Sequence, residues 1–343
     1  MITATQALVL FFSSFFIVGT FTPLMRKIAL KLNFVDRPNS SHKSHSEAIP
    51  YLGGIAIILG IIPVIFTALL SQENLSGNLW IALSFFTPAL LLGIVGLIDD
   101  RKALNPLPRL IAQSSAGAFI AIFVIATNTI GNPSGNLILD AIITIIWLVG
   151  ISNSINFFDN LDGGAAGAVA ATAIGLAFIT QSNGQTFLAA CSITIFAAML
   201  GFLIWNKSPA RIYMGDAGSL FLGTIIAVLT IRLNPNVDSK IVSFAIPILL
   251  LAVPILDTSV AIISRLQRGV PIYQGGRDHL SHRLIRRGFS KREAAFTLWS
   301  LSLIFVAMAA KLATNSTTPI YFVYLAIAFW IFLLVLFLKS SNS

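Results

Sequence analysis

Apolar segments of about 20 residues recur along the whole chain, and each is long enough to cross a hydrocarbon core about 30 Å thick. In lipid every backbone N–H and C=O group must be bonded internally, so continuous runs of this kind are expected to be helices. Mean hydropathy is +0.87 and only 10% of the residues are charged, whereas about a quarter are charged in soluble domains. The sequence therefore predicts an all-α, polytopic integral membrane protein that forms one domain over residues 1–343.

The apolar runs predict ten to eleven transmembrane helices. They cover residues 5–25, 51–70, 79–98, 109–127, 137–152, 163–181, 186–205, 217–231, 241–263, 293–311 and 319–338. Pro247 and Pro254 predict a kink or a break in the ninth run. The first run has no basic segment before it, so it is expected to be a retained helix rather than a signal peptide. The single Cys191 excludes a disulfide framework and a cysteine-based metal site.

Positive charge is concentrated in alternate connections between these spans. Eighteen of the 22 Lys and Arg residues lie in or beside the connections after the first, third, seventh and ninth runs. The positive-inside rule places these connections in the cytoplasm and the N-terminus outside. A net charge of +9 is also compatible with binding nucleic acid or anionic lipid, but topogenic charge is the commoner reason in a membrane protein. No nucleic-acid partner is expected.

Acidic side chains collect at the same end of the predicted bundle. They are Asp36, Glu47, Asp99, Asp100, Asp159, Asp162, Asp216, Asp278 and Glu293. Because Lys and Arg alone assign the topology, this grouping independently indicates a site on the cytoplasmic face.

Asp99 and Asp100 directly follow an apolar run at the cytoplasmic end of the third span. Two adjacent carboxylates repel each other, and a divalent cation, basic partners or a shared proton would hold them there. A solvated helix end, with Arg101 and Lys102 as counter-charges, explains the pair equally well.

The segment 153–164 combines Asn, Asp and Gly residues without any Lys or Arg, between one apolar run and the next. Asp159 and Asp162 are three residues apart, so both would face one side if the turn is helical. Gly163 and Gly164 would let a ligand approach the backbone closely. A tight loop favours the same residue types, but it does not need such a cluster between intramembrane helices. A functional role is therefore favoured.

Two further segments carry polar residues at the same end. Asp216, in the segment 213–219, begins the eighth span, where a helix N-terminus and glycine-rich backbone suit an anion or a metal-bound phosphate. Taken alone, Asp216 is more simply interpreted as an N-cap. The loop 275–283 carries Arg and His side chains that suit pyrophosphate, although an anchor loop for anionic lipid headgroups is the alternative. Nearby oxygen ligands favour Mg²⁺ or Mn²⁺ over Zn²⁺.

Carboxylates, amides, glycines and His or Arg side chains thus gather on one face of one membrane domain. This set suits phosphoryl transfer, in which catalysis is mostly positioning and charge neutralisation around a divalent ion. The alternative is a transporter or flippase of lipid-linked or anionic solutes. A transporter should place its essential acids near the bilayer midplane, whereas only Asp257 lies within a span. That intramembrane acid is a functional candidate in its own right.

Five ordered blocks run along about residues 33–293. They are Asp36-Arg-Pro-Asn with Lys43-Ser-His45 and Pro50-x-x-Gly-Gly; Gly-Leu-Ile-Asp99-Asp100; Asn153-x-x-Asn156-x-x-Asp159-x-x-Asp162-Gly; Asn206 with Tyr-Met-Gly-Asp216-x-Gly-Ser; and Arg277-Asp-His279-x-x-His282-Arg283. In residue type and order they resemble the polyprenyl-phosphate N-acetylhexosamine-1-phosphate transferase family, the MraY/WecA/TagO type of glycosyltransferase family 4.

The resemblance implies a reaction in the cell membrane. A UDP-activated amino sugar would donate its sugar 1-phosphate to a polyprenyl phosphate such as undecaprenyl phosphate, giving a lipid-linked sugar pyrophosphate and UMP for cell-wall or cell-surface glycan synthesis. It also implies Mg²⁺, with Mn²⁺ as the alternative, and membrane lipids as partners. The resemblance is compatible with a monomer or a homodimer.

Motif positions carry the implied roles over to this chain. Asp216 would be a metal ligand, joined by Asp159 and Asn156, and Asp99 or Asp100 would be the base or the orienter of the lipid phosphate. The residues implied to bind substrate are Lys43, His45, Asn156, Asp159, Asp162, Asn206, His279, His282 and Arg283.

Three positions depart from the family pattern. Asn160 stands where Gly is frequent, Gly164 where Leu is common, and Ser281 where the loop often has His. The basic loop 277–283 and the eleventh span resemble the WecA and TagO branch more than the MraY branch, which uses a muramoyl-pentapeptide donor. UDP-N-acetylglucosamine is therefore the expected donor, and an MraY-like donor is the alternative. An inactive scaffold is disfavoured because every acidic block is intact.

Overall fold

The computed structural model describes residues 1–36, 49–70, 75–314 and 320–339. Two short strands, β1 (Val35–Asp36) and β2 (Ile49–Pro50), pair antiparallel. The helices are α1 (Ala4–Lys31), α2 (Gly53–Leu70), α3 (Leu75–Lys102), α4 (Pro106–Ala126), α5 (Leu137–Phe158), α6 (Gly164–Ser182), α7 (Thr186–Asn206), α8 (Gly215–Arg232), α9 (Lys240–Leu250), α10 (Ala252–Gln267), α11 (Leu280–Arg286), α12 (Lys291–Thr314) and α13 (Tyr321–Lys339).

The predicted all-α membrane architecture is confirmed. Within the described ranges, ten helices are long and apolar enough to cross a membrane, and the bent pair α9–α10 makes an eleventh span. Each predicted run corresponds to one of them. The largest differences at a helix end are at α1, which continues six residues past the predicted end at 25, and at α5, which continues six residues past the predicted end at 152. Asn153 sits inside this helix because its side-chain amide bonds to Gln113 and to the Val149 carbonyl, so it is not left unpaired.

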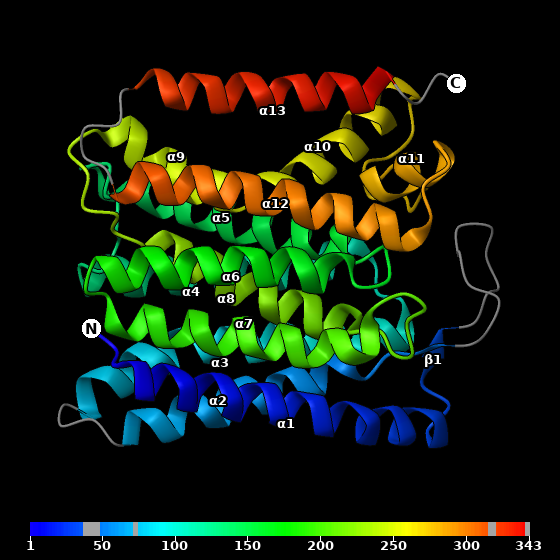
Figure 1. Cartoon of the computed structure of the whole chain (residues 1–343), viewed down its shortest axis with the longest axis horizontal. Helices are drawn as coiled ribbons and strands as arrows, with labels where there is room; N and C mark the ends of the chain where they lie inside the picture. The colour runs from blue at the N-terminus through cyan, green and yellow to red at the C-terminus, as the bar shows by residue number, and fades with distance from the viewer. Residues whose placement is uncertain (37–48, 71–74, 315–319, 340–343) are drawn as a thin grey trace.

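The ninth span is broken, as its prolines predict. The axes of α9 and α10 differ by 75°. Pro254 has no N–H to donate to the Leu250 carbonyl, which would be its partner in a continuous helix. The hydroxyl of Thr172 on α6 donates to that carbonyl instead, at 2.7 Å. The break is therefore compensated by a neighbouring helix, and α10 is free to run in a new direction toward α11 (Figure 1).

The helix α8 lies at the centre of the bundle. Its apolar stretch is 89% buried, compared with 28% for α1 and 22% for α13. It packs against α3 and α5. This close packing requires glycine at the contacts. A Cβ on Gly96 would collide with the backbone at Asp216, and a Cβ on Gly54 would collide with the backbone of Gly218. The N-terminus of α8 is therefore held firmly between α2 and α3.

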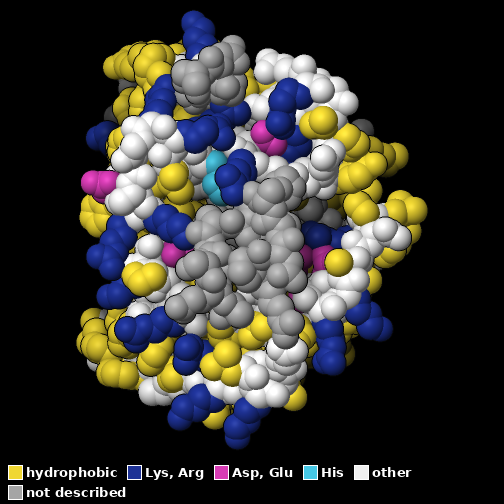
Figure 2. Space-filling model, turned by 90° about the vertical axis from the view of Figure 1, so that its right-hand side faces the viewer, with side chains coloured by type: hydrophobic (Ala, Val, Ile, Leu, Met, Phe, Trp, Pro, Cys, Tyr) yellow, Lys and Arg dark blue, Asp and Glu magenta, His cyan; other side chains and the backbone are white. Residues whose placement is uncertain are grey.

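The polar segments lie at one end of the bundle. Figure 1 shows the N-terminus at the opposite end from β1 and α11, with the C-terminal end of α13 on the side of α11. Figure 2 views that end directly, and it shows many Lys and Arg side chains with acidic and His side chains among them. The predicted grouping of acids with the basic connections is thus seen in the fold. Its assignment to the cytoplasmic side stays a prediction.

Candidate active site

The adjacent acids at the end of α3 have different partners. Asp99 accepts from the Arg109 guanidinium at 2.5 Å and from the Leu104 N–H at 2.6 Å. Asp100 accepts from the backbone N–H groups of Asp216 and Ala217, at 2.8 and 3.2 Å. These are unpaired donors of the first turn of α8, and a carboxylate there also meets the positive end of the helix dipole. Asp99 is therefore ion-paired, and Asp100 caps α8.

This arrangement corrects the N-cap interpretation of Asp216. The helix α8 begins at Gly215, its N-cap position is Met214, and neither supplies a side-chain cap. Gly215 has φ of 69°, and a Cβ there would collide with the Asp100 carboxylate. Because Asp100 performs the capping from another helix, the side chain of Asp216 is free to face the cavity. It is 29% exposed.

Arg109, at the start of α4, connects three predicted site residues. Its guanidinium contacts Asp99, the Asn156 side-chain oxygen at 3.0 Å and Asp216 at 3.3 Å. Asn156 in turn donates to Asp216 at 2.7 Å and to the Ser219 hydroxyl at 2.9 Å. Sequence reasoning treated Arg109 as topogenic charge only. The one available signal was its place at the start of a span, ten residues after the acidic pair.

The turn between α5 and α6 places two more acids beside the cavity. Asp159 is the C-cap of α5. Burial and the neighbouring Asp216, Asp100 and Asp162 carboxylates raise the pKa of Asp159 well above its ordinary value. Asp162 accepts from the Ala210 N–H at 3.2 Å and lies 3.9 Å from the Lys291 ammonium group. Asp159 thus faces mainly like charge, whereas Asp162 is tied to the protein.

Two predicted substrate residues do not line the cavity. Asn206 is 1% exposed, accepts from the Gly163 N–H at 3.1 Å and donates to the Ile212 carbonyl at 2.9 Å, so it joins two turns. Arg283 is also 1% exposed and donates to the carbonyls of Asp278 and Phe337, at 2.9 and 2.6 Å. The side-chain polar groups of Asn206 and Arg283 are bonded internally in this structure, which suits framework roles. Their predicted contacts with substrate stay predictions.

The remaining basic-loop residues form the other wall of the cavity. His279 and His282 line it, with ring centroids 6.2 Å apart. Burial, more than any neighbouring charge, lowers the pKa of His282 from 6.5 to about 4. The Ser281 hydroxyl donates to the Asn160 side chain. Two of the three departures from the family pattern, Asn160 and Ser281, therefore contact each other and join the α5–α6 turn to α11.

These walls enclose a cavity of about 820 Å³. Eight of the predicted site residues line it: Asp99, Asp100, Asn156, Asp159, Asp162, Asp216, His279 and His282. Tyr51 and Tyr213, which sequence reasoning did not select, line it too, and burial together with nearby carboxylates raises the pKa of each hydroxyl. Lys43 and His45 lie outside the described residues.

A divalent cation suits the acidic wall. In the part of the chain that the structure describes, no three His, Cys, Asp or Glu side chains converge into a complete metal cage. Mg²⁺ does not need one, because it commonly uses one or two carboxylates together with water and substrate phosphates. Asp216 and Asp159 supply such oxygens. The Asn156 oxygen already accepts from Arg109, so here Asn156 holds Asp216 in place.

The chain is similar to known membrane transferases. The model of glycosyl transferase family 4 matches residues 81–234. A probable undecaprenyl-phosphate N-acetylglucosaminyl 1-phosphate transferase of Bacillus subtilis is 31% identical over 341 residues, which cover 97% of this chain and 90% of the relative. The chain belongs to glycosyl transferase family 4. The predicted family resemblance is thereby confirmed, and this family 4 protein is a multi-pass membrane protein.

Other relatives of this family 4 protein differ in coverage. The undecaprenyl-phosphate alpha-N-acetylglucosaminyl 1-phosphate transferase of Yersinia pestis is 28% identical over 321 residues, covering 90% of this chain and 85% of the relative. A phospho-N-acetylmuramoyl-pentapeptide-transferase of Streptococcus agalactiae is 31% identical over 201 residues, covering 54% of this chain and 60% of the relative.

Proposed function

We propose that this family 4 protein transfers N-acetylglucosamine 1-phosphate from UDP-N-acetylglucosamine to undecaprenyl phosphate, or a related polyprenyl phosphate, at the cytoplasmic face of the cell membrane. The observation that carries the proposal is the convergence of five separate sequence segments on one cavity with an acidic and a basic wall. Relatives that match 90% or more of the chain are named for this activity. Cell-surface or cell-wall glycan synthesis would use the product.

The proposed chemistry is a displacement at phosphorus. An oxygen of the lipid phosphate bonds to the phosphorus that carries the sugar, and the bond from that phosphorus to the UMP oxygen breaks. A phosphate monoester has a second pKa of about 6, so it is largely ionised at neutral pH. Asp99 and Asp100 are both engaged in hydrogen bonds. They are therefore better suited to orienting the phosphate than to removing a proton or attacking as a nucleophile.

The two walls would bind different groups, the acidic wall a metal ion and the opposite wall the donor's pyrophosphate. Asp216 and Asp159 would hold Mg²⁺, or Mn²⁺, which would neutralise charge on the donor phosphates. Arg109 and Asn156 keep Asp216 in position. His282 lies on the opposite wall and would contact the donor's pyrophosphate. His279 lines the same wall, but both of its ring nitrogens are bonded within the protein. The reacting phosphate would then lie between the bound cation, which would neutralise its charge, and the hydrogen-bonding side chain of His282.

An MraY-like donor is the second candidate, favoured by the pentapeptide-transferase relatives, but these match only 54% of the chain. A transporter is less well supported, since Asp99, Asp100 and Asp216 lie at helix ends and Asp257 contacts a residue of the same site.

The test is a transfer assay with purified protein in detergent. Labelled UDP-N-acetylglucosamine, undecaprenyl phosphate and Mg²⁺ should give a labelled lipid and UMP, and omission of the lipid should prevent UMP release. A parallel reaction with UDP-N-acetylmuramoyl-pentapeptide separates the two donors. Failure to form a labelled lipid from any of a panel of UDP-sugars would reject the transferase proposal.

A further inference from the structure

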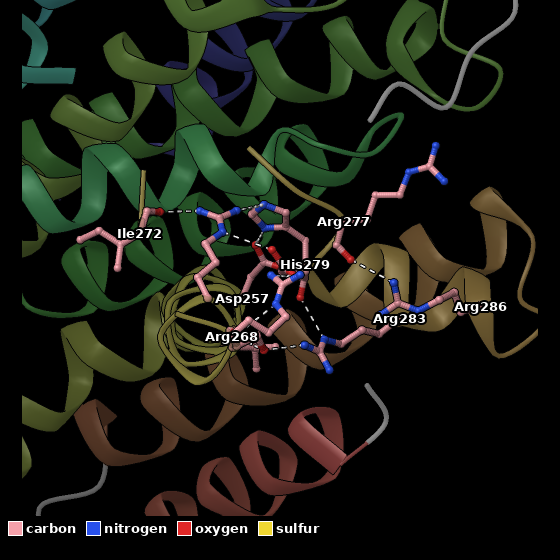
Figure 3. Close-up of polar contacts among 11 residues, drawn as sticks. Asp257, Arg268, Ile272, Arg277, His279, Arg283 and Arg286 are labelled. Carbon is pink, nitrogen blue, oxygen red and sulfur yellow. Dashed lines mark hydrogen bonds and ion pairs between the residues drawn. The ribbon is translucent and has the colours of Figure 1, made fainter. Parts of the chain in front are cut away.

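Asp257 is a fully buried acid on α10 with both carboxylate oxygens engaged. One oxygen lies 2.7 Å from His279 Nδ1, and the other accepts from the Leu280 N–H at 2.7 Å. Figure 3 shows Asp257 and His279 together, with Arg268 and Arg283 nearby. The 75° break before α10 brings Asp257 here from within the ninth span. This acid therefore fixes the imidazole of His279 and the first turn of α11 at once.

The surroundings determine which nitrogen of His279 carries hydrogen. Arg265 Nη2 lies 3.3 Å from His279 Nε2. A guanidinium has five N–H donors and no acceptor, so Nε2 must accept this hydrogen bond. Nδ1 then carries the hydrogen and donates it to Asp257, since the bond at one ring nitrogen fixes the state of the other. The hydrogen bonds run in one direction, from Arg265 to His279 to Asp257.

Arg265 connects His279 to the backbone that forms the wall of the cavity. It is 2% exposed, and its other nitrogens donate to the Ile272 carbonyl at 2.7 Å and to the Asp278 carboxylate at 3.2 Å. The connection between Ile272 and Asp278 contains Gly275 and Gly276, which line the cavity. A Cβ on Gly276 would lie close to the Asp278 carboxylate. The backbone of this wall thus depends on where Arg265 is held.

We propose that Asp257 is a positioning residue of the donor-phosphate wall, which acts by fixing the tautomer of His279 and, through it, the position of Arg265 and the 272–278 connection. The expected change in KM rests on the function proposed above, whereas the expected tautomer of His279 does not. Asp257 itself lies behind the cavity and touches no substrate. It reaches the site only through the imidazole.

The variant Asp257→Asn isolates this role because it keeps shape and removes one acceptor. An Asn side chain has one acceptor oxygen and one donor nitrogen. If the oxygen keeps the Leu280 N–H, the amide N–H must face Nδ1, and the hydrogen of His279 is forced onto Nε2. Two donors, from Nε2 and Arg265, then face each other, and Arg265 is displaced.

The first experiment follows the imidazole nitrogens by NMR in protein labelled with ¹⁵N-histidine. The chain has four His, and His279→Gln identifies the signal. We expect hydrogen on Nδ1 in the wild type and on Nε2 in Asp257→Asn. The control is Asp140→Asn. Asp140 is a buried acid in the first turn of α5, at the end of that helix away from the cavity, and it accepts from the Ser134 N–H. This variant should leave the signal unchanged. Hydrogen on Nε2 in the wild type, or no change in Asp257→Asn, would overturn the proposal whatever reaction the protein catalyses.

The second experiment measures turnover. Asp257→Asn should raise the KM for the UDP-sugar by about tenfold, because the displaced Arg265 no longer holds the backbone of the donor-phosphate wall and small misplacements of binding groups are costly. The KM for polyprenyl phosphate should change by less than about twofold. In a His279→Gln background the same substitution should add little. A purely structural acid would instead lower thermal stability and kcat without this dependence on His279. Additive losses in the double variant would reject the positioning role.

Discussion

The two walls of the cavity differ in how far their charged side chains are paired within the protein. On the acidic wall Asp99, Asp100, Asp159 and Asp216 lie close together, and Arg109 is the cation that pairs with two of them. Behind the basic wall the guanidinium of Arg265 is bonded to Asp278 and His279, and Arg283 is bonded to carbonyls. The acidic wall therefore has excess charge facing the cavity, whereas much of the basic wall's charge is used internally.

Proton affinities show the same contrast. The pKa of Asp159 is raised by burial and by neighbouring carboxylates, and the pKa values of Tyr51 and Tyr213 are raised as well. On the other wall the pKa of His282 is lowered, to about 4. Burial is the largest cause of each of these shifts, and on the acidic wall the neighbouring carboxylates add to it. The comparison teaches that the acidic wall gathers negative charge that suits a cation, whereas the other wall presents His282 as a neutral ring near neutral pH.

Removing charge from the acidic wall should give the largest effect. Asp216→Asn keeps the hydrogen bond geometry near Asn156 but loses the carboxylate that we propose as a metal ligand. Turnover should fall by about a hundredfold or more, the scale seen when a group that stabilises transition-state charge is removed. Chelation of divalent ions from the wild type should reproduce the loss. Folding is checked by comparison with Asp140→Asn, and metal-dependent turnover near the wild-type rate in Asp216→Asn would contradict the assigned role.

Removing the Arg109 guanidinium from the same wall should have a smaller effect, which lowers kcat but also lowers the Mg²⁺ requirement. Arg109→Gln leaves Asp99 and Asp216 without their shared partner, so kcat should fall by roughly tenfold. The wall also becomes more negative, so the Mg²⁺ concentration for half-maximal rate should fall severalfold. The control Lys27→Gln removes an exposed charge of α1 at the same end of the molecule. A rise in the Mg²⁺ requirement would mean that Arg109 helps to hold the metal's oxygen ligands more than it competes with the metal.

The spans were predictable because each apolar run must satisfy its own backbone in lipid, a local requirement that the sequence shows directly. The end of α5 was missed because Asn153 and Asn156 look like loop residues, and only their partners on α4 and α8 make them suitable for a helix. The break in the ninth span was predictable from its prolines. Its angle was not, since neighbouring side chains set it.

The site residues were predictable as a set but not one by one. Asn206 and Arg283 belong to the same sequence blocks as the lining residues, and only burial separates framework from contact. Asp99 and Asp100 are adjacent, yet they have different partners on α4 and α8. The role of Asp257 depends on His279, 22 residues later. Such pairings arise from packing between helices, which spacing along the chain does not record.

The smallest effect is expected at His282, through pH. In the unfolded chain this imidazole has a pKa near 6.5, and in the folded protein about 4. As pH falls from 6.5 toward 4, the unfolded chain binds a proton that the folded protein does not, so the folded state loses stability in that window and retains it above. His282→Gln removes this contribution. Its melting temperature should therefore fall less than that of the wild type between pH 7 and pH 4.5.

The measurement is thermal unfolding in detergent, followed by Trp fluorescence at both pH values. Raised carboxyl pKa values on the acidic wall act in the opposite direction, since their protonation at low pH relieves repulsion in the folded state. They are common to both proteins, so the difference between wild type and His282→Gln isolates the imidazole. An equal fall in both would show that the pKa of His282 in the folded protein is close to its ordinary value of 6.5. The ring would then be positively charged below that pH, and it would face the donor's phosphates as a cation there instead of as a neutral hydrogen-bonding group.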